Sequence, residues 1–167
     1  SNIYLGNYQT GIEFLIRGIG EYLATGTHSS LSQYLSALAL GYAGAGDLEK
    51  ALTTIDDAFG AAGEEFMHLP ELHRTKATLL AQRGRDGDMD EAEKEFRKAI
   101  SIAQEFGSLM IELRSVTQLG RLLQSCGRAS EARDMLAPLY ARITEGFDSP
   151  DLLEAKALLD ELNSSQV

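Results

Sequence analysis

The sequence is poor in residues that cross-link a chain, break helices or bind anions. It has one cysteine, three prolines and 15 basic residues against 25 acidic ones in 167 residues. The single cysteine, Cys126, excludes an intrachain disulfide and fits a reducing, cytoplasmic compartment. Few prolines, together with abundant Ala, Leu and Glu, favour an all-α fold. The net charge of −10 repels phosphate groups, so we expect no nucleic acid and no anionic membrane as a partner of this segment.

Long apolar runs are missing as well. No stretch of 18 uninterrupted apolar residues occurs, which predicts no transmembrane helix. No charged segment followed by an apolar run opens the chain, so no signal peptide is expected. The chain starts without Met and in the middle of a repeat, which favours a segment of a longer protein. Its length predicts a single domain over 1–167 that can bury a sizeable core.

A glycine-led turn followed by a patterned helix occurs three times. The turns begin at Gly46, Gly87 and Gly127. Five residues after each glycine an alanine follows, and these alanines recur with a period of 40 to 41 residues. An internal repeat of this length predicts a stacked array of helical hairpins.

The apolar spacing predicts eight helices with helical periodicity. They divide into a lone first helix, three hairpins and a capping helix. The expected ranges are 10–25 for the lone helix, 30–60, 70–105 and 109–143 for the hairpins, and 149–162 for the capping helix. Ser30, Asp47 and Ser149 are the expected caps of their helices, and a capping pair is expected either between Asp88 and Glu91 or between Asp90 and Glu93.

Small residues mark the place where the two helices of each hairpin cross. In the first helices they are Ala39, Ala77 and Gly120, and in the second helices Ala51, Ala92 and Ala132, at separations of 12, 15 and 12. Antiparallel helices approach closely only where no bulky side chain intervenes. The spacing of 12 and the glycine–acid turn resemble the tetratricopeptide repeat. The period is longer than the usual 34 residues of that repeat and is shared by HEAT-type repeats, which remain an alternative.

The last third of the chain resembles a more specific family. The segment 136–159 is similar to the C-terminal end of the tetratricopeptide region in large bacterial signalling proteins. In these, the region follows a nucleotide-cyclase or DNA-binding domain and a central STAND-type ATPase. The helix starts Glu71-Leu72-His73-Arg74 and Glu112-Leu113-Arg114 resemble that family too. The resemblance implies a helical array within a regulator, and it assigns no upstream activity to this chain.

No motif in the sequence builds an active site. The series Asp86, Asp88, Asp90 lacks the glycine and glutamate of a calcium loop, so a charged turn is the better interpretation. His68 and His73 are five residues apart, whereas zinc helices use a spacing of four, and no cysteine or third histidine lies near them in the sequence. Surface or capping roles are therefore favoured. We therefore expect no enzyme, no metal and no cofactor.

The first helices of the hairpins carry the candidate binding site. In tetratricopeptide arrays these helices line a groove used for peptides or partner helices. Counting from the small residues places a polar set rich in arginine in that groove. The set is Gln33, Ser36, Glu71, Arg74, Thr78, Gln82, Arg114, Thr117, Arg121 and Gln124. An ordinary hydrated surface is the competing interpretation, with Glu71 and other acids neutralising the arginines.

The capping helix is expected to close the array. Four leucines, at 152, 158, 159 and 162, can cover the two helices before it, and the acids Asp151, Glu154, Asp160 and Glu161 are expected to face water. The helical pattern predicts a non-enzymatic protein-interaction or sensory module, and the family resemblance implies that this module belongs to a bacterial signalling or transcription regulator. The partner is a protein, a peptide or another domain of the same protein. Two alternatives stay open: an array that senses a small effector molecule, and a structural spacer or dimerisation arm.

Overall fold

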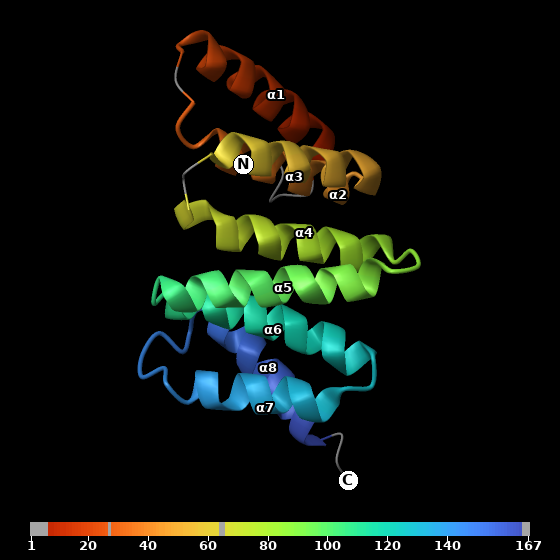
Figure 1. Ribbon diagram of the computed structural model, residues 1–167, viewed down its shortest axis with the longest axis vertical. Coiled ribbons are helices and arrows are strands. Elements are labelled where there is room, and N and C mark those ends of the chain that lie inside the picture. The colour runs from red at the N-terminus through yellow and green to blue at the C-terminus, as the bar shows by residue number, and fades with distance from the viewer. Residues whose placement is uncertain (1–6, 27, 64–65, 165–167) are drawn as a thin grey trace.

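The computed structural model describes residues 7–26, 28–63 and 66–164, and its regular structure is entirely helical within those ranges (Figure 1). The helices are α1 (Tyr8–Ala24), α2 (Leu31–Gly44), α3 (Leu48–Ala62), α4 (Leu69–Arg83), α5 (Asp88–Glu105), α6 (Leu109–Ser125), α7 (Ala129–Tyr140) and α8 (Pro150–Ser164), with a short 3₁₀ turn η1 (Phe66–His68) before α4. The prediction of an all-α array of helical hairpins is confirmed.

The helices stack in chain order along the long axis of the molecule. The turns within the hairpins α2–α3, α4–α5 and α6–α7 lie on one edge, and the connections between hairpins lie on the opposite edge (Figure 1). The first helices of the hairpins also contact one another, α2 with α4 and α4 with α6, and α8 continues this series by packing on α6. We call the surface formed by α2, α4, α6 and α8 the first-helix face.

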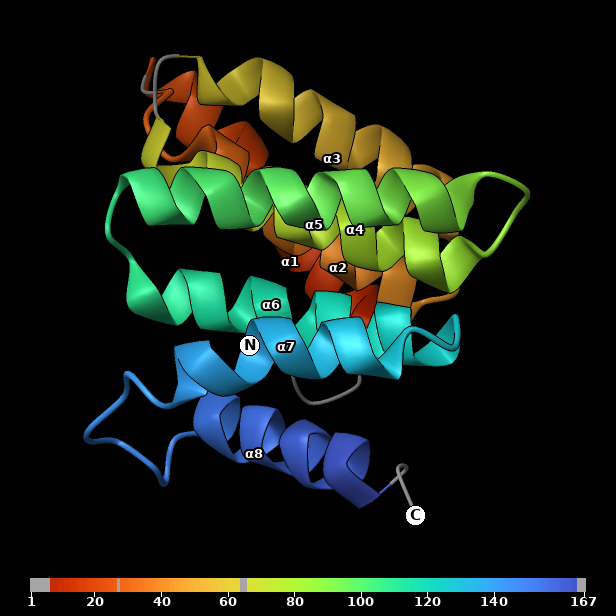
Figure 2. The ribbon, with the colours of Figure 1, turned by 60° about the horizontal axis from the view of Figure 1, so that its bottom comes forward.

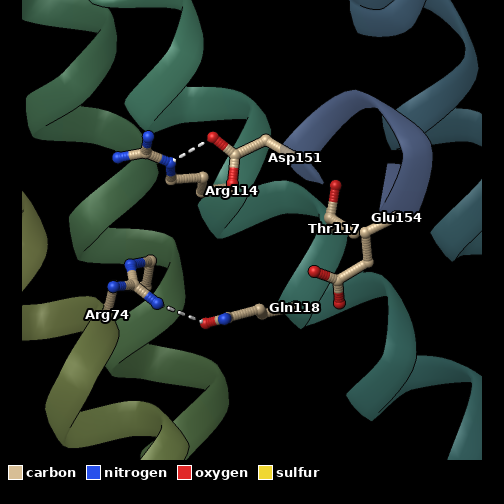
Figure 3. A pocket seen from close by; sticks show the side chains of 6 residues that line it. All are labelled: Arg74, Arg114, Thr117, Gln118, Asp151 and Glu154. Atoms are coloured by element: carbon tan, nitrogen blue, oxygen red, sulfur yellow. Dashed lines mark hydrogen bonds and ion pairs between the residues drawn. The ribbon is translucent and has the colours of Figure 1, made fainter. Parts of the chain in front are cut away.

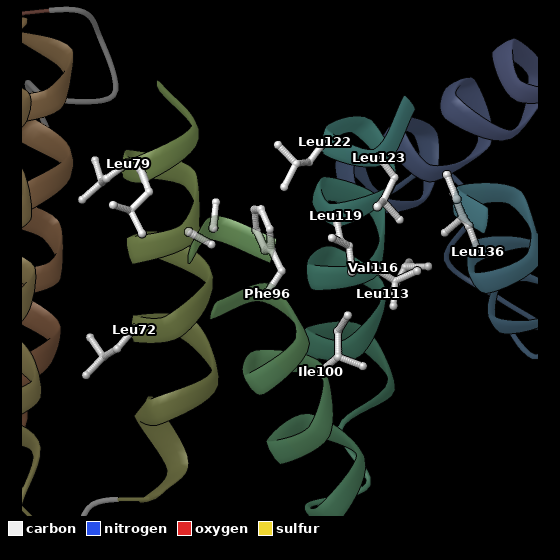
Figure 4. Packing of buried hydrophobic residues seen from close by; sticks show 14 of the residues in the cluster. Leu72, Leu79, Phe96, Ile100, Leu113, Val116, Leu119, Leu122, Leu123 and Leu136 are labelled. Carbon is white, nitrogen blue, oxygen red and sulfur yellow. The ribbon is translucent and has the colours of Figure 1, made fainter. Parts of the chain in front are cut away.

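The hairpins close around the small residues, as their spacing predicts. Ala39, Ala51, Ala77, Ala92 and Ala132 have no exposed surface. Gly120 also lies in a tight place, because a Cβ built there would lie 3.0 Å from Cδ2 of Leu158. Leucines, with Phe96 and Ile100, fill the space between successive hairpins (Figure 4). Close crossings therefore leave one continuous core along the array.

The capping helix α8 packs on both α6 and α7 at the end of the array (Figure 2). Leu152, Leu158 and Leu162 are buried, whereas Leu159 is half-buried. The helix continues to Ser164, two residues further than expected, and the last three residues of the expected polar tail lie outside the described residues. The preceding helix α7 ends earlier than expected, at Tyr140.

Three of the expected caps differ from the structure. Ser30 precedes α2 with a φ of 65° and makes no side-chain cap bond, and the Ser149 hydroxyl has no hydrogen-bond partner. Asp88 does not form a capping pair with Glu91, because it lies inside the first turn of α5 and binds Arg83. Asp47 caps α3 as its type suggests, since its carboxylate accepts a hydrogen bond from the backbone of Lys50 at 3.1 Å.

Candidate functional site

The predicted binding residues all belong to helices of the first-helix face, but only some of them line a cavity. Six of the ten do: Arg74, Arg114 and Thr117 line one cavity, and Thr78, Gln82 and Arg121 line a second. Gln124 lies outside both, as do Gln33, Ser36 and Glu71. The side-chain nitrogen of Gln33 lies 2.8 Å from Nδ1 of His68, so this residue joins α2 to the start of α4.

The first cavity is polar and lies between α4, α6 and α8 (Figure 3). Its volume is about 170 Å³, and its lining consists of Arg74, Arg114, Thr117, Gln118, Asp151 and Glu154. Nη1 of Arg74 donates to Oε1 of Gln118 at 3.0 Å, and Nε of Arg114 donates to Oδ2 of Asp151 at 2.7 Å. The hydrogen bond to Asp151 raises the pKa of Arg114 above its ordinary value.

Thr117 gives this cavity an unused polar atom. The residue is 3% exposed, and its hydroxyl has no hydrogen-bond partner. A buried hydroxyl without a partner costs free energy, since it has lost its bonds to water. The cavity can therefore offer a ligand one donor or acceptor that the protein itself does not satisfy.

The arginines of the first-helix face are paired with acids and do not form a positive cluster. Arg74 pairs with Glu71 at 2.6 Å, and Arg114 lies between Glu71 at 3.4 Å and Asp151. The structure agrees with the competing interpretation, in which Glu71 and other acids neutralise these arginines.

Arg121 is compensated in the same way, by acids from the capping helix. Its guanidinium lies 3.5 Å from Glu154 and 3.3 Å from Glu161. Glu154 and Glu161 are exposed, as expected, but they also pair with Arg121, and Asp151 is half-buried beside Arg114. These acids meet the arginines of α6 because α8 continues the series of first helices and turns the same side towards the face.

The second cavity is larger and more apolar. It has a volume of about 390 Å³ and opens between α4, the start of α5 and α6. The lining residues are Thr78, Ala81, Gln82, Met89, Phe96, Gln118, Arg121, Leu122, Ser125 and Glu154. Gln118 and Glu154 border both cavities, so the two form one continuous depression.

Several lining residues were missed by the sequence pattern. Gln118 lies one helical turn after Arg114 and could have been found by the same counting. Asp151 and Glu154 were expected on the solvent-facing side of a capping helix. They line the cavity because α8 takes the place of a first helix in the stack and so adds to the first-helix face. Met89 belongs to a second helix, and no periodicity of the first helices points to it.

No metal-binding cluster accompanies this depression in the described part of the chain. Among the described residues, no three His, Cys, Asp or Glu side chains come close enough to hold a metal ion. Cys126 is exposed at the end of α6. None of the described helices is long and apolar enough to cross a membrane.

His73 has an interior role rather than the expected surface or capping role. Its ring packs on Phe59, with 4.7 Å between centroids, and Nδ1 lies 2.5 Å from Oε2 of Glu95. Burial alone would raise the pKa of Glu95, but hydrogen bonds from His73 and Lys98 outweigh it and lower the pKa to about 2. This group joins α3, α4 and α5 on the side of α4 that faces the core.

The comparisons with known proteins agree with the geometry of the fold. No family model and no curated protein matches the sequence. Among solved structures, a putative kinesin light chain from Podosopora anserina with nearly identical TPR-like repeats has a TM-score of 0.72 at 18% identity, over 99% of this chain and 83% of that one. BtubC (BKLC) from P. vanneervenii has a TM-score of 0.73 at 16% identity, over 98% of this chain and 74% of that one. The chain thus has the fold of a TPR-like repeat solenoid.

Proposed function

We propose that this chain is a non-enzymatic protein-interaction module whose first-helix face binds a peptide segment, either of another protein or of another domain of the same protein. One observation carries the proposal: a polar and an apolar cavity adjoin on this face and share Gln118 and Glu154. An extended peptide presents both kinds of group at short intervals, because its backbone is polar and its side chains alternate in direction. TPR-like folds are in general non-catalytic scaffolds, which supports the same conclusion.

Each cavity suits a different part of such a segment. The apolar one has Met89, Phe96 and Leu122 in its lining, and about 390 Å³ accommodates an aliphatic or aromatic side chain. The polar one offers the free hydroxyl of Thr117 beside the amide of Gln118, which together can bind a peptide group. Because the charges around it are balanced, we expect selection by shape and hydrogen bonding rather than by net charge.

The wider setting is a cytoplasmic bacterial signalling or transcription regulator. This part of the proposal rests on the resemblance of residues 136–159 to the end of the helical array in STAND-type regulators. There the array would receive a signal and transmit it to the catalytic or DNA-binding domains upstream.

A second candidate is the sensing of a small effector molecule in the same depression. Its support is the volume of the apolar cavity, which falls within the roughly 300–1,000 Å³ of small-molecule sites. A thermal-shift screen of metabolites and peptides separates the two, since only the class that binds raises the melting temperature. The melting temperature of a purely structural spacer would change with neither metabolites nor peptides.

Site-specific photo-crosslinking in the producing cell tests the peptide proposal. A photoreactive residue at Gln82, at the mouth of the apolar cavity, should crosslink a partner, and one at Lys94, exposed on α5, should not. Met89→Glu, at a position 39% exposed in the cavity, should abolish the crosslink at Gln82. Met67→Glu, at a position 76% exposed and distant from the cavity, is the matched control. Equal crosslinking at both positions, or a Met89→Glu variant with undiminished crosslinking, would exclude this face as the binding surface.

A further inference from the structure

The polar cavity between α4, α6 and α8 contains polar atoms that bond to no described residue (Figure 3). They belong to Thr117 and Gln118 on α6 and to Asp151 and Glu154 on α8. A polar atom without a partner in a confined space favours a ligand that bonds to it. The donors and acceptors left over therefore indicate which chemical group this cavity takes.

The hydroxyl of Thr117 does not bond to its own helix, unlike other hydroxyls in the array. Four helical side chains donate to the backbone oxygen four residues earlier, at 2.8 to 3.0 Å, namely Thr53, Thr54, Thr78 and Ser115. Thr117 makes no such bond, although only 3% of its surface is exposed. Its hydroxyl is thus buried in the cavity wall with its donor and its lone pairs still available.

The amide of Gln118 has an orientation that leaves its nitrogen available. Its Oε1 accepts from Nη1 of Arg74 at 3.0 Å and from the Thr78 hydroxyl at 3.1 Å. Because a guanidinium only donates, the amide atom beside Arg74 must be the oxygen. Nε2 then points away from Arg74 and donates to no described residue. The α6 wall of the cavity therefore has unused donors on two consecutive residues.

The α8 wall of the cavity has unused acceptors. Oδ2 of Asp151 accepts from Nε of Arg114 at 2.7 Å, but Oδ1 accepts from no described residue. Glu154 lies 3.5 Å from Nε of Arg121 and accepts no hydrogen bond within the described part of the chain. One wall of the cavity can therefore donate while the other can accept.

The charges around the cavity are already balanced. Each charged side chain of the lining has an opposite charge beside it, in the pairs Arg74–Glu71, Arg114–Asp151 and Arg121–Glu154. A charged ligand group would add an uncompensated charge to a partly desolvated space, at a cost in free energy. The cavity therefore suits a neutral group that donates on one side and accepts on the other.

A primary carboxamide matches this arrangement of donors and acceptors. Its nitrogen carries two N–H groups, one for each carboxylate on α8, and its oxygen can accept from Gln118 and Thr117 on α6. A backbone peptide group has a single N–H and would leave one carboxylate without a partner. The side chain of Asn or Gln can also enter the cavity alone, whereas a backbone group brings its flanking residues with it.

The adjoining apolar cavity sets the distance between this carboxamide and an apolar residue. The two cavities share Gln118 and Glu154 and are direct neighbours. In an extended segment, side chains two residues apart point to the same side and are separated by about 7 Å. We propose that the first-helix face recognises a peptide in which the carboxamide of an Asn or Gln enters the polar cavity and an apolar side chain two positions away enters the apolar cavity. This specificity rests on the proposed function, in which that face binds a peptide.

Selection from a library of random seven-residue peptides, displayed on phage and captured by the purified chain, tests the proposal. We expect enriched sequences in which Asn or Gln stands two positions from Leu, Ile, Met or Phe. A parallel selection on Met89→Glu should not enrich them, because the variant places a charge in the apolar cavity. This arm shows whether the selected peptides bind at the first-helix face.

Synthetic versions of the most enriched peptide measure the role of the carboxamide. Its Asn or Gln is replaced by the matching acid, by methionine or by lysine, and the Kd of each peptide is determined by fluorescence anisotropy. We expect each replacement to raise the Kd at least tenfold, because several hydrogen bonds are lost. Gln118→Glu keeps the oxygen beside Arg74 but replaces the amide donors by a second acceptor. This variant should reverse the preference, so that the lysine peptide binds more tightly than the carboxamide peptide.

Thr117→Val separates recognition from folding. The variant removes a hydroxyl that makes no bond within the described chain, so the melting temperature should not fall, whereas the Kd of the carboxamide peptide should rise about tenfold. Thr54→Val is the matched control, because this buried threonine lies on α3 and lines neither cavity. It should leave the Kd unchanged.

The possible results distinguish this specificity from peptide binding as such. Peptides that are enriched by the wild type and lost with Met89→Glu, but that bind equally well with the acid, methionine or lysine, overturn the carboxamide proposal and leave the proposed function intact. A Gln118→Glu variant that still prefers the carboxamide peptide overturns it too. If no peptide is enriched, or if enrichment is indifferent to Met89→Glu, both this specificity and the proposed function are overturned.

Discussion

Arg83 and Asp88 form a two-point ion pair across the turn that joins α4 to α5. Nε of Arg83 donates to Oδ2 at 2.9 Å and Nη2 donates to Oδ1 at 2.7 Å. The backbone N–H of Arg85 donates to the same carboxylate at 2.9 Å. This turn spans residues 84–87, one residue more than the turns 45–47 and 126–128 of the other hairpins, and the ion pair gives it a fixed conformation.

The ion pair predicts a defined dependence of stability on pH. The hydrogen bond from Arg83, followed by that from Arg85, lowers the pKa of Asp88 from 3.8 to about 2. A carboxyl with a lowered folded-state pKa stabilises the fold above its unfolded-state pKa, and this contribution is lost as the pH falls from about 4 to about 2. Asp88→Asn should therefore lower the melting temperature at neutral pH, with a smaller difference near pH 2. Asp86→Asn is the control, because Asp86 is exposed and makes no ion pair within the described residues. Identical neutral-pH melting of the two variants would contradict the role of Asp88.

Helical periodicity and the small residues were sufficient to predict the fold. The stripe at 92, 96, 99 and 103 predicts a helix that ends at residue 105, which is where α5 ends, because the pattern reflects the burial of one side of the helix. Cap chemistry was less predictable. Whether Ser149 or Asp88 binds its own helix or a neighbouring group depends on tertiary contacts that sequence spacing does not contain.

A bulky residue at a hairpin crossing should separate the two helices. Ala132 has no exposed surface, and its Cβ lies 3.7 Å from the position a Cβ would take on Gly120. Ala132→Leu adds three carbons where no space exists, and we expect a loss of about 1–3 kcal/mol in the free energy of unfolding. Ala137→Leu changes an exposed position on the same helix and serves as the control. Denaturant titration of both measures the difference, and equal midpoints would mean that the crossing tolerates a larger side chain.

Counting along the first helices found where the arginines lie but not which acids pair with them. Counting from Ala77 and Gly120 located Arg74, Arg114 and Arg121 on one side of the array, because a rigid helix fixes the angular position of each residue. The count did not reveal their acidic neighbours on α8. Those contacts depend on how α8 continues the stack, which is a property of packing between hairpins rather than of any one helix.

Removal of α8 should expose the end of the core. A chain that ends at Gly146 loses the buried Leu152, Leu158 and Leu162, each contributing on the order of 2 kcal/mol. We expect aggregation or a large fall in melting temperature. A chain that ends at Ser164 keeps the whole helix and is the control. A shortened chain that stays monomeric and melts like the control would show that α8 does not cap the array.

The arginines of α6 should hold α8 in place through charge, and a charge exchange separates this effect from packing. Arg114→Glu creates repulsion with Asp151 and Glu71, where the wild-type distances are 2.7 and 3.4 Å. Each partly exposed pair contributes about 0.2–1 kcal/mol, so the variant should melt measurably lower at low ionic strength and approach the wild type at high salt. Combining Arg114→Glu with Asp151→Arg restores an opposite pair in the same place and should recover most of the loss. The double variant keeps the polar cavity but exchanges the positive and negative side chains across it. A change in partner binding by this variant, at recovered stability, would therefore report on the cavity itself. Failure of the exchange to recover any stability would mean that Arg114 acts through its packing and not through its charge.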